Sequence, residues 1–132
     1  LLRPVSYIRA YIDPNWVTNL RDKYKGGIKN VGITPAHPSY PSGHSVFGAV
    51  ASEILGEVFG QATAFTDRSH EDRKDFLGMP RSFASFDEMM LENAYSRIGL
   101  GVHYRMDCEE GLRIGKIVGK GVNAMSWKRI KN

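Results

Sequence analysis

Residues 42–59 read SGHSVFGAVASEILGEVF, and this stretch decides the fold class of the chain. Its apolar side chains recur at the i, i+1, i+4 and i+5 spacing of one helix face over about four turns. They are Val46, Phe47, Val50, Ala51, Ile54, Leu55, Val58 and Phe59. The stretch therefore predicts an amphipathic helix that follows the segment Pro41-Ser42-Gly43-His44.

Two further helices are predicted downstream. Ser85 and Glu88 have the spacing of a capping box, and one helix face follows them: Phe86, Met89, Met90, Asn93, Ala94, Arg97 and Ile98. A third helical segment, about 103–125, carries Leu112, Ile117, Val118, Val122 and Met125. The sequence has no run at strand period and no repeat at solenoid or propeller periods. It thus predicts an all-α fold, a helical bundle of three to four main helices.

The remaining segments are predicted to be less regular. Residues 1–20 mix apolar residues with Pro4 and Pro14, which favours short helical turns interrupted by proline. Residues 25–41 are rich in glycine and proline and predict a long loop, of a length that usually has a function. Residues 61–82 are polar with little periodicity and predict a surface excursion with one short helix.

Length and charge exclude several classes of protein. A chain of 132 residues has room for one domain, which we assign to residues 1–132. Eighteen Lys and Arg against fourteen Asp and Glu give a net charge of +4, which suits anionic ligands and falls short of a nucleic-acid binder. The longest stretch without a charged residue, 30–52, contains three prolines and two histidines, so no membrane span is expected.

The lone cysteine and the first residues carry little chemistry. Cys108 cannot form an intrachain disulfide and does not have the surroundings of a nucleophile. The chain begins Leu-Leu-Arg-Pro, without Met and without a signal segment, so we expect it to be a piece of a longer protein.

The first candidate site is the segment Pro41-Ser42-Gly43-His44, immediately before the first helix. Free backbone N–H groups and the positive end of the helix dipole point at an anion there, and Gly43 allows an oxyanion to approach the backbone. Taken alone, the segment is explained more simply: Ser42 is an N-cap, Gly43 a turn residue and His44 a solvent-exposed residue.

The second candidate site combines Arg97, His103 and Asp107. If His103 and Asp107 lie on one helix, their i, i+4 spacing places the carboxylate beside the imidazole, where it orients the ring and raises its basicity. Arg97 falls on the apolar face of its helix, where a guanidinium needs an anionic partner. In the alternative interpretation, His103 is an ordinary core histidine and Arg97 pairs with an internal carboxylate: Glu53, Glu57 or Glu92.

Together these blocks resemble a known signature. Arg3-Pro4, then Pro41-Ser-Gly-His44, then Ser96-Arg97 followed by His103 and Asp107, resemble the superfamily that unites vanadium-dependent haloperoxidases with type 2 phosphatidic acid phosphatases and bacterial acid phosphatases. Within this superfamily, the sequences of residues 37–44 and 92–107 are most similar to those of the soluble, bacterial haloperoxidase-like branch. The chain resembles the C-terminal core of such proteins.

The resemblance implies a role for each matched residue. Arg3 and Arg97 clamp an oxyanion, Ser42 and the Gly43 amide donate hydrogen bonds, and His44 is an acid-base residue. His103 is the axial group and the only protein ligand to vanadium, supported by Asp107. The implied cofactor is vanadate, whose site also suits phosphate or sulfate, and the implied substrates are hydrogen peroxide and a halide.

The same resemblance leaves a second activity open. In a soluble acid phosphatase, His103 would attack the phosphorus of a phosphate monoester and His44 would protonate the leaving alcohol. His37 occupies a position that the resemblance associates with bromoperoxidases, which favours bromide or iodide over chloride. A loop histidine is otherwise most simply a surface residue.

The chain departs from the family pattern in two ways. The Lys expected seven positions before Arg3 would fall before Leu1 and is absent from this chain. The N-terminal helical half of the family is also absent, so we expect an exposed apolar face, weak or no activity, and association with that half or into a homo-oligomer. A non-catalytic anion-binding remnant is the third interpretation. The resemblance favours an extracytoplasmic location.

Overall fold

The computed structural model describes residues 2–19, 32–72 and 78–125. Four helices lie in these ranges: α1 (Pro4–Tyr11), α2 (Gly43–Phe59), α3 (Phe86–Gly99) and α4 (Arg105–Asn123). Two short strands, β1 (Phe65–Asp67) and β2 (Arg81–Phe83), form an antiparallel pair. The predicted all-α class and its three main helices are confirmed.

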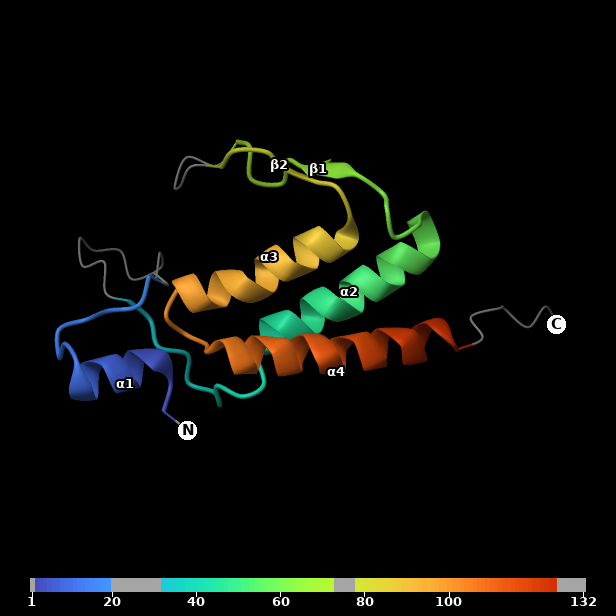
Figure 1. Ribbon diagram of the computed structural model, residues 1–132. Helices are drawn as coiled ribbons and strands as arrows, with labels where there is room; N and C mark the ends of the chain where they lie inside the picture. The colour runs from blue at the N-terminus through green and yellow to red at the C-terminus, as the bar shows by residue number, and fades with distance from the viewer. Residues whose placement is uncertain (1, 20–31, 73–77, 126–132) are drawn as a thin grey trace.

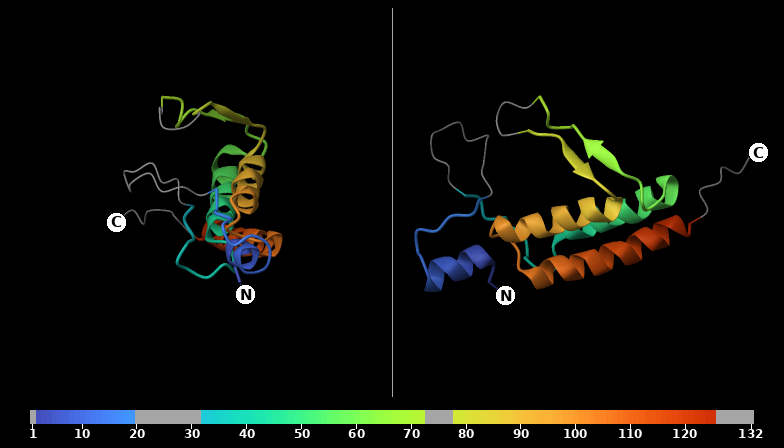
Figure 2. Two further views of the ribbon diagram at one scale, coloured as in Figure 1. Left: turned by 90° about the vertical axis from the view of Figure 1, so that its left-hand side faces the viewer. Right: turned by 45° about the horizontal axis from the view of Figure 1, so that its top comes forward.

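The three long helices form the body of the molecule (Figures 1 and 2). α2 and α4 run side by side in the same direction, and α3 packs against α2 in the opposite direction. α1 lies beside the beginning of α4, and the β1–β2 hairpin lies beyond the beginning of α3. The starts of α2 and α4 and the end of α3 therefore meet at one end of the bundle.

A row of glycines brings α4 close to α2. A Cβ added at Gly111 would lie 2.5 Å from the backbone oxygen of Ser42, and one at Gly115 would lie 2.4 Å from that of Val46. Gly119 has an equally tight contact with Glu53. Because no side chain separates the helices, the Ser42 amide reaches the backbone oxygen of Asp107 at 2.9 Å. This hydrogen bond joins the first turns of the two helices.

The buried apolar cluster lies where the three long helices meet. It contains Ala49, Met90, Ala94, Cys108 and Leu112, with Tyr95 and Ile98 packed against it. The thiol of Cys108 is fully buried and lies 3.2 Å from the backbone oxygen of Ala94. Burial raises the pKa of this thiol, which keeps it protonated and unreactive.

The segment 61–82 differs from its prediction. In place of a short helix, its described residues contain β1 and most of β2, with Phe65 opposite Phe83. The rings of Phe65, Phe83 and Phe86 pack together with centroids 5.2–5.3 Å apart. Three residues per strand are too few to show the alternation by which a strand is recognised in a sequence. Residues 20–31, most of the predicted long loop, lie outside the described residues.

Apolar side chains are exposed on both α2 and α4: 77% at Phe47 and 65% at Val58 on α2, and 59% at Ile117 and 46% at Val118 on α4. We call these four residues the open face. Within the described ranges, no helix has the length and apolar character needed to span a membrane.

Candidate functional site

The N-terminus of α2 presents unpaired backbone donors. Ser42 is the N-cap, and its Oγ accepts a hydrogen bond from the Ser45 amide at 3.5 Å. The amides of Gly43 and His44 have no acceptor among the described residues. A Cβ added at Gly43 would meet nothing within 4 Å, so the space before these amides is open. This helix start has the geometry that binds an anion.

A buried hydrogen-bonded group lies next to it. His103 is 2% exposed and Asp107 fully buried, and Nδ1 of His103 lies 3.3 Å from Oδ2 of Asp107. Ser39 Oγ donates to the same carboxylate oxygen at 2.5 Å and lies 3.4 Å from His103 Nδ1. The Tyr104 amide also donates to Oδ2, at 3.0 Å. The carboxylate thus fixes both the histidine ring and the start of α4.

His103 and Asp107 meet in a different way from the helical i, i+4 pair that the sequence suggested. His103 precedes α4 by two residues and is not on a helix with Asp107. Asp107 occupies the third position of α4 and turns back toward the residues before the helix, as acidic residues at helix starts do. The imidazole and the carboxylate meet because of this cap, not because of an i, i+4 helical pair.

The environment sets the protonation of His103. Burial lowers its pKa below the ordinary value, and the Asp107 carboxylate offsets part of this effect. The ring is therefore neutral at neutral pH, with its proton on Nδ1, the nitrogen that faces Asp107. The lone pair of Nε2 is left free to act as a ligand or nucleophile.

Arg3 connects α1 to the site. Its guanidinium donates to the backbone oxygen of Val102 at 2.8 Å, to that of Pro38 at 3.2 Å and to that of His37. His37 Nδ1 lies 3.3 Å from the same guanidinium. Arg3 is buried and holds the loop before Ser39 against the segment before His103. A guanidinium has five donors, so this tether leaves some of them for an anion.

Arg97 and His44 are the remaining basic groups of the site. Arg97 lies in the last turn of α3, half-buried, and donates to Ser96 Oγ at 3.1 Å. Among the described residues it has no carboxylate partner; Glu92 pairs with Arg81 instead. The alternative internal ion pair for Arg97 is therefore not formed. The pKa of His44 is lowered by desolvation and by the positive charges of Arg97, His103 and His37.

The structure thus brings all the candidate residues of the sequence to one end of the bundle. Five basic groups converge there, from α1, α2, α3 and the two loops: Arg3, His37, His44, Arg97 and His103. Asp107 is the carboxylate that faces them, and its Oδ1 is buried without a hydrogen-bond partner. In the described part of the chain, no three His, Cys, Asp or Glu side chains gather into a metal-ion site. Guanidinium and amide donors around one free imidazole nitrogen suit an oxyanion such as vanadate or phosphate.

Ser39 is a site residue that sequence reasoning missed. Its position in a proline-rich loop carries no local signal, because its contact with Asp107 joins residues 68 positions apart. Replacing Ser39 with Ala should lower the free energy of unfolding by about 1–3 kcal/mol, since a buried carboxylate loses a short hydrogen bond. Urea unfolding measures this. Ser82→Ala, which removes an exposed hydroxyl, should stay within about 0.5 kcal/mol of wild type; an equal effect of both substitutions would refute the role of Ser39.

The lowered histidine pKa values predict how stability depends on pH. The unfolded chain takes up protons at His44 and His103 at higher pH than the folded chain does, so stability should fall as the pH drops below about 6.5. Asp107→Asn should steepen this fall, because the carboxylate raises the pKa of His103. Urea unfolding at pH 7.5 and 5.5 separates this effect from carboxylate titration at lower pH. Equal stability at the two pH values would contradict the prediction.

Comparison with known proteins gives consistent matches. A sequence model of the family described as VCPO second helical-bundle domain matches residues 1–132. The chain is 30% identical over 94 residues to the vanadium-dependent bromoperoxidase of Ascophyllum nodosum, a match that covers 64% of this chain and 17% of that protein. It is 27% identical over 143 aligned positions to the vanadium chloroperoxidase of Curvularia inaequalis, which covers 80% and 23% respectively.

A solved structure matches over nearly the whole chain. It is the crystal structure described as the first bacterial vanadium-dependent iodoperoxidase, with a TM-score of 0.78 and 35% sequence identity. The match covers 96% of this chain and 27% of that one. The chain therefore spans between 17% and 27% of the length of these three proteins.

Proposed function

Because this chain belongs to the vanadium haloperoxidase family and matches its VCPO second helical-bundle domain over residues 1–132, we propose that it forms the vanadate-binding core of a haloperoxidase. The proposed reaction is the oxidation of bromide or iodide by hydrogen peroxide. The observation that carries the proposal is the convergence of four other basic side chains and the free α2 amides around the neutral, buried His103.

Each residue has a defined part in this proposal. When bound, vanadate supplies a Lewis acid that activates peroxide toward the halide. His103 provides Nε2 as the protein ligand, held in orientation by Asp107. Arg3 and Arg97 would offset the charge of the anion, and the Gly43 amide and the Ser42 hydroxyl would donate hydrogen bonds to its oxygens. His44, whose lowered pKa leaves it neutral at neutral pH, can accept a proton there.

Halide oxidation tests the function. With the family's N-terminal half restored to the chain, iodide and bromide oxidation in the presence of peroxide should depend on vanadate loading. In the phosphatase alternative, the same oxyanion-binding residues would serve phosphoryl transfer, and vanadate would inhibit phosphate-ester hydrolysis instead of activating oxidation. Tight vanadate binding with neither activity would identify the chain as a non-catalytic anion-binding unit. A vanadate-dependent rate supports our proposal and the other two results contradict it.

His37 is proposed to influence the halide preference. Its imidazole lies against the Arg3 guanidinium, and its charge acts on His44, so it belongs to the basic cluster although it is exposed. The proteins matched above are described as acting on bromide, chloride and iodide respectively. For this chain we propose bromide or iodide, and the ratio of the two oxidation rates to that of chloride tests the preference directly.

The open face is proposed to be covered by a further helical bundle of the longer protein. The matched family is described as a second bundle domain, and large apolar side chains are exposed on α2 and α4. Alone, the chain should self-associate through this face. Sedimentation velocity should show this, and Phe47→Asp with Ile117→Asp should shift the chain to a monomer. Leu91→Asp, an exposed apolar position on α3, serves as the control; a wild-type monomer at all concentrations would contradict the proposal.

A further inference from the structure

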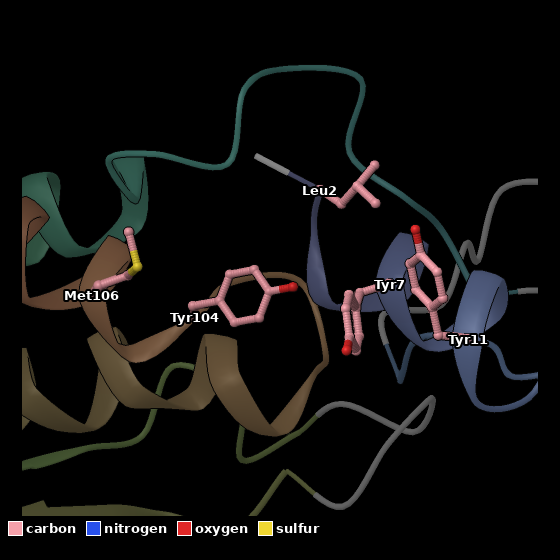
Figure 3. A pocket seen from close by; sticks show the side chains of 5 residues that line it. All are labelled: Leu2, Tyr7, Tyr11, Tyr104 and Met106. Atoms are coloured by element: carbon pink, nitrogen blue, oxygen red, sulfur yellow. The ribbon is translucent and has the colours of Figure 1, made fainter.

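A pocket with no assigned role lies between α1 and the first turn of α4 (Figure 3). Its volume is about 410 Å³, and its lining is three phenol rings, a thioether and one aliphatic side chain. The lining residues are Leu2, Tyr7, Tyr11, Tyr104 and Met106. None of them is charged. This size and composition are typical of a site for a small apolar molecule.

The aromatic rings have an arrangement that suits a flat ligand. Tyr7 and Tyr11 lie one turn apart on α1, with ring centroids 4.9 Å apart and planes tilted by 43°. Tyr104 comes from the other wall, and its hydroxyl points toward α1 (Figure 3). Tilted and offset aromatic pairs are favourable, so a third ring can add to this group without displacing it.

The polar character of the pocket comes from Tyr104. Its hydroxyl points toward α1 and can donate a hydrogen bond to a ligand there. A group of tyrosines can also hold a cation, but no carboxylate lines this pocket and the basic cluster around Arg3 lies beside it. A neutral ligand is favoured.

We propose that this pocket binds a neutral phenol-class aromatic molecule, stacked on Tyr7 and Tyr11 and hydrogen-bonded by the Tyr104 hydroxyl. Two lining residues, Leu2 and Tyr104, are the sequence neighbours of Arg3 and His103 in the oxyanion site. The role of this ligand rests on the proposed function: the bound aromatic molecule is the acceptor of the oxidised halogen. A ring carbon attacks the halogen of hypohalous acid, the carbon–halogen bond forms as the halogen–oxygen bond breaks, the ring loses a proton, and water leaves.

Binding is tested without the catalytic reaction. 4-Ethylphenol is titrated into the chain in the absence of vanadate, halide and peroxide, and saturation-transfer NMR reports binding at the ligand's ring protons. We expect a dissociation constant of roughly millimolar order. Tyr104→Phe should weaken binding by about fivefold, the worth of one neutral hydrogen bond, and Tyr7→Ala should weaken it further. Tyr40→Phe, which removes a hydroxyl outside the pocket, should leave binding unchanged.

Other outcomes would overturn the proposal. Binding unaffected by both pocket variants would place the ligand elsewhere, and equal binding of cyclohexanol would remove the aromatic specificity. Tighter binding of phenyltrimethylammonium would make the pocket a cation site. Because Tyr7 and Tyr11 are exposed, circular dichroism should show that the variants keep their helices. Phenol binding without halide oxidation would support the pocket as a phenol site and refute the proposed function. Halide oxidation without phenol binding would support the proposed function and refute the phenol site.

Discussion

Replacing His103 with Ala should weaken vanadate binding by more than about 100-fold and abolish halide oxidation. Residues that merely support a metal ligand change affinity by about 10–100-fold, and the ligand itself should have a larger effect. The buried imidazole offers the free Nε2, oriented by Asp107 and Ser39, while arginines and amides can only hold oxygens. Equilibrium dialysis measures the affinity.

Two controls make this result specific. His70→Ala removes an exposed histidine between β1 and β2 and should leave the affinity within about twofold of wild type. Added imidazole should restore part of the binding in His103→Ala, because the substitution leaves a cavity of matching shape beside Asp107. If the affinity of His103→Ala stays near that of wild type, His103 is a core histidine and not a ligand.

Replacing Gly111 with Ala should lower the free energy of unfolding by about 1–3 kcal/mol, the range of an overpacked core. The new Cβ would lie 2.5 Å from the backbone oxygen of Ser42 and 2.7 Å from Cβ of Ser45. Both are held by α2 and cannot rotate away. The helices must separate, which strains the hydrogen bond from the Ser42 amide to Asp107 and displaces the anion-binding end of α2. Vanadate affinity should fall together with stability.

Gly121→Ala is the matched control on the same helix. A Cβ at Gly121 meets nothing within 4 Å, and alanine favours the helix over glycine by about 0.5–1 kcal/mol. This variant should therefore be as stable as wild type or more stable. Urea unfolding of both variants settles the comparison. If Gly111→Ala is also at least as stable as wild type, the close contact between α2 and α4 is not what positions the site.

The helices were predictable because their signals are local. The apolar stripe after Ser42 and the capping pair Ser85 and Glu88 locate α2 and α3 almost to the residue. The start of α4 was predicted about two residues early, since the capping action of Asp107 depends on the side chain turning back. The glycine row of α4 has no hydrophobic signal, although it determines how closely the two helices pack.

The candidate site was likewise predictable only where the sequence carries a local signal. Arg97, His103 and Asp107 were identified from their spacing and from a family resemblance, and the structure brings them together with His44. Ser39 and the tether from Arg3 to the loop join residues far apart in the sequence, so no local pattern could reveal them. The tyrosine pocket likewise needs α1 to lie beside α4, an arrangement that only the fold supplies.

The most direct test of the central claim is a vanadium-51 NMR titration of vanadate with this chain. The oxyanion site predicts that the free vanadate signal disappears at one equivalent of protein and returns when excess phosphate competes for the same donors. Arg97→Ala should weaken this uptake, because the guanidinium has no other charged partner among the described residues. A free vanadate signal that persists with excess protein would contradict the assignment of the α2 end as an oxyanion site.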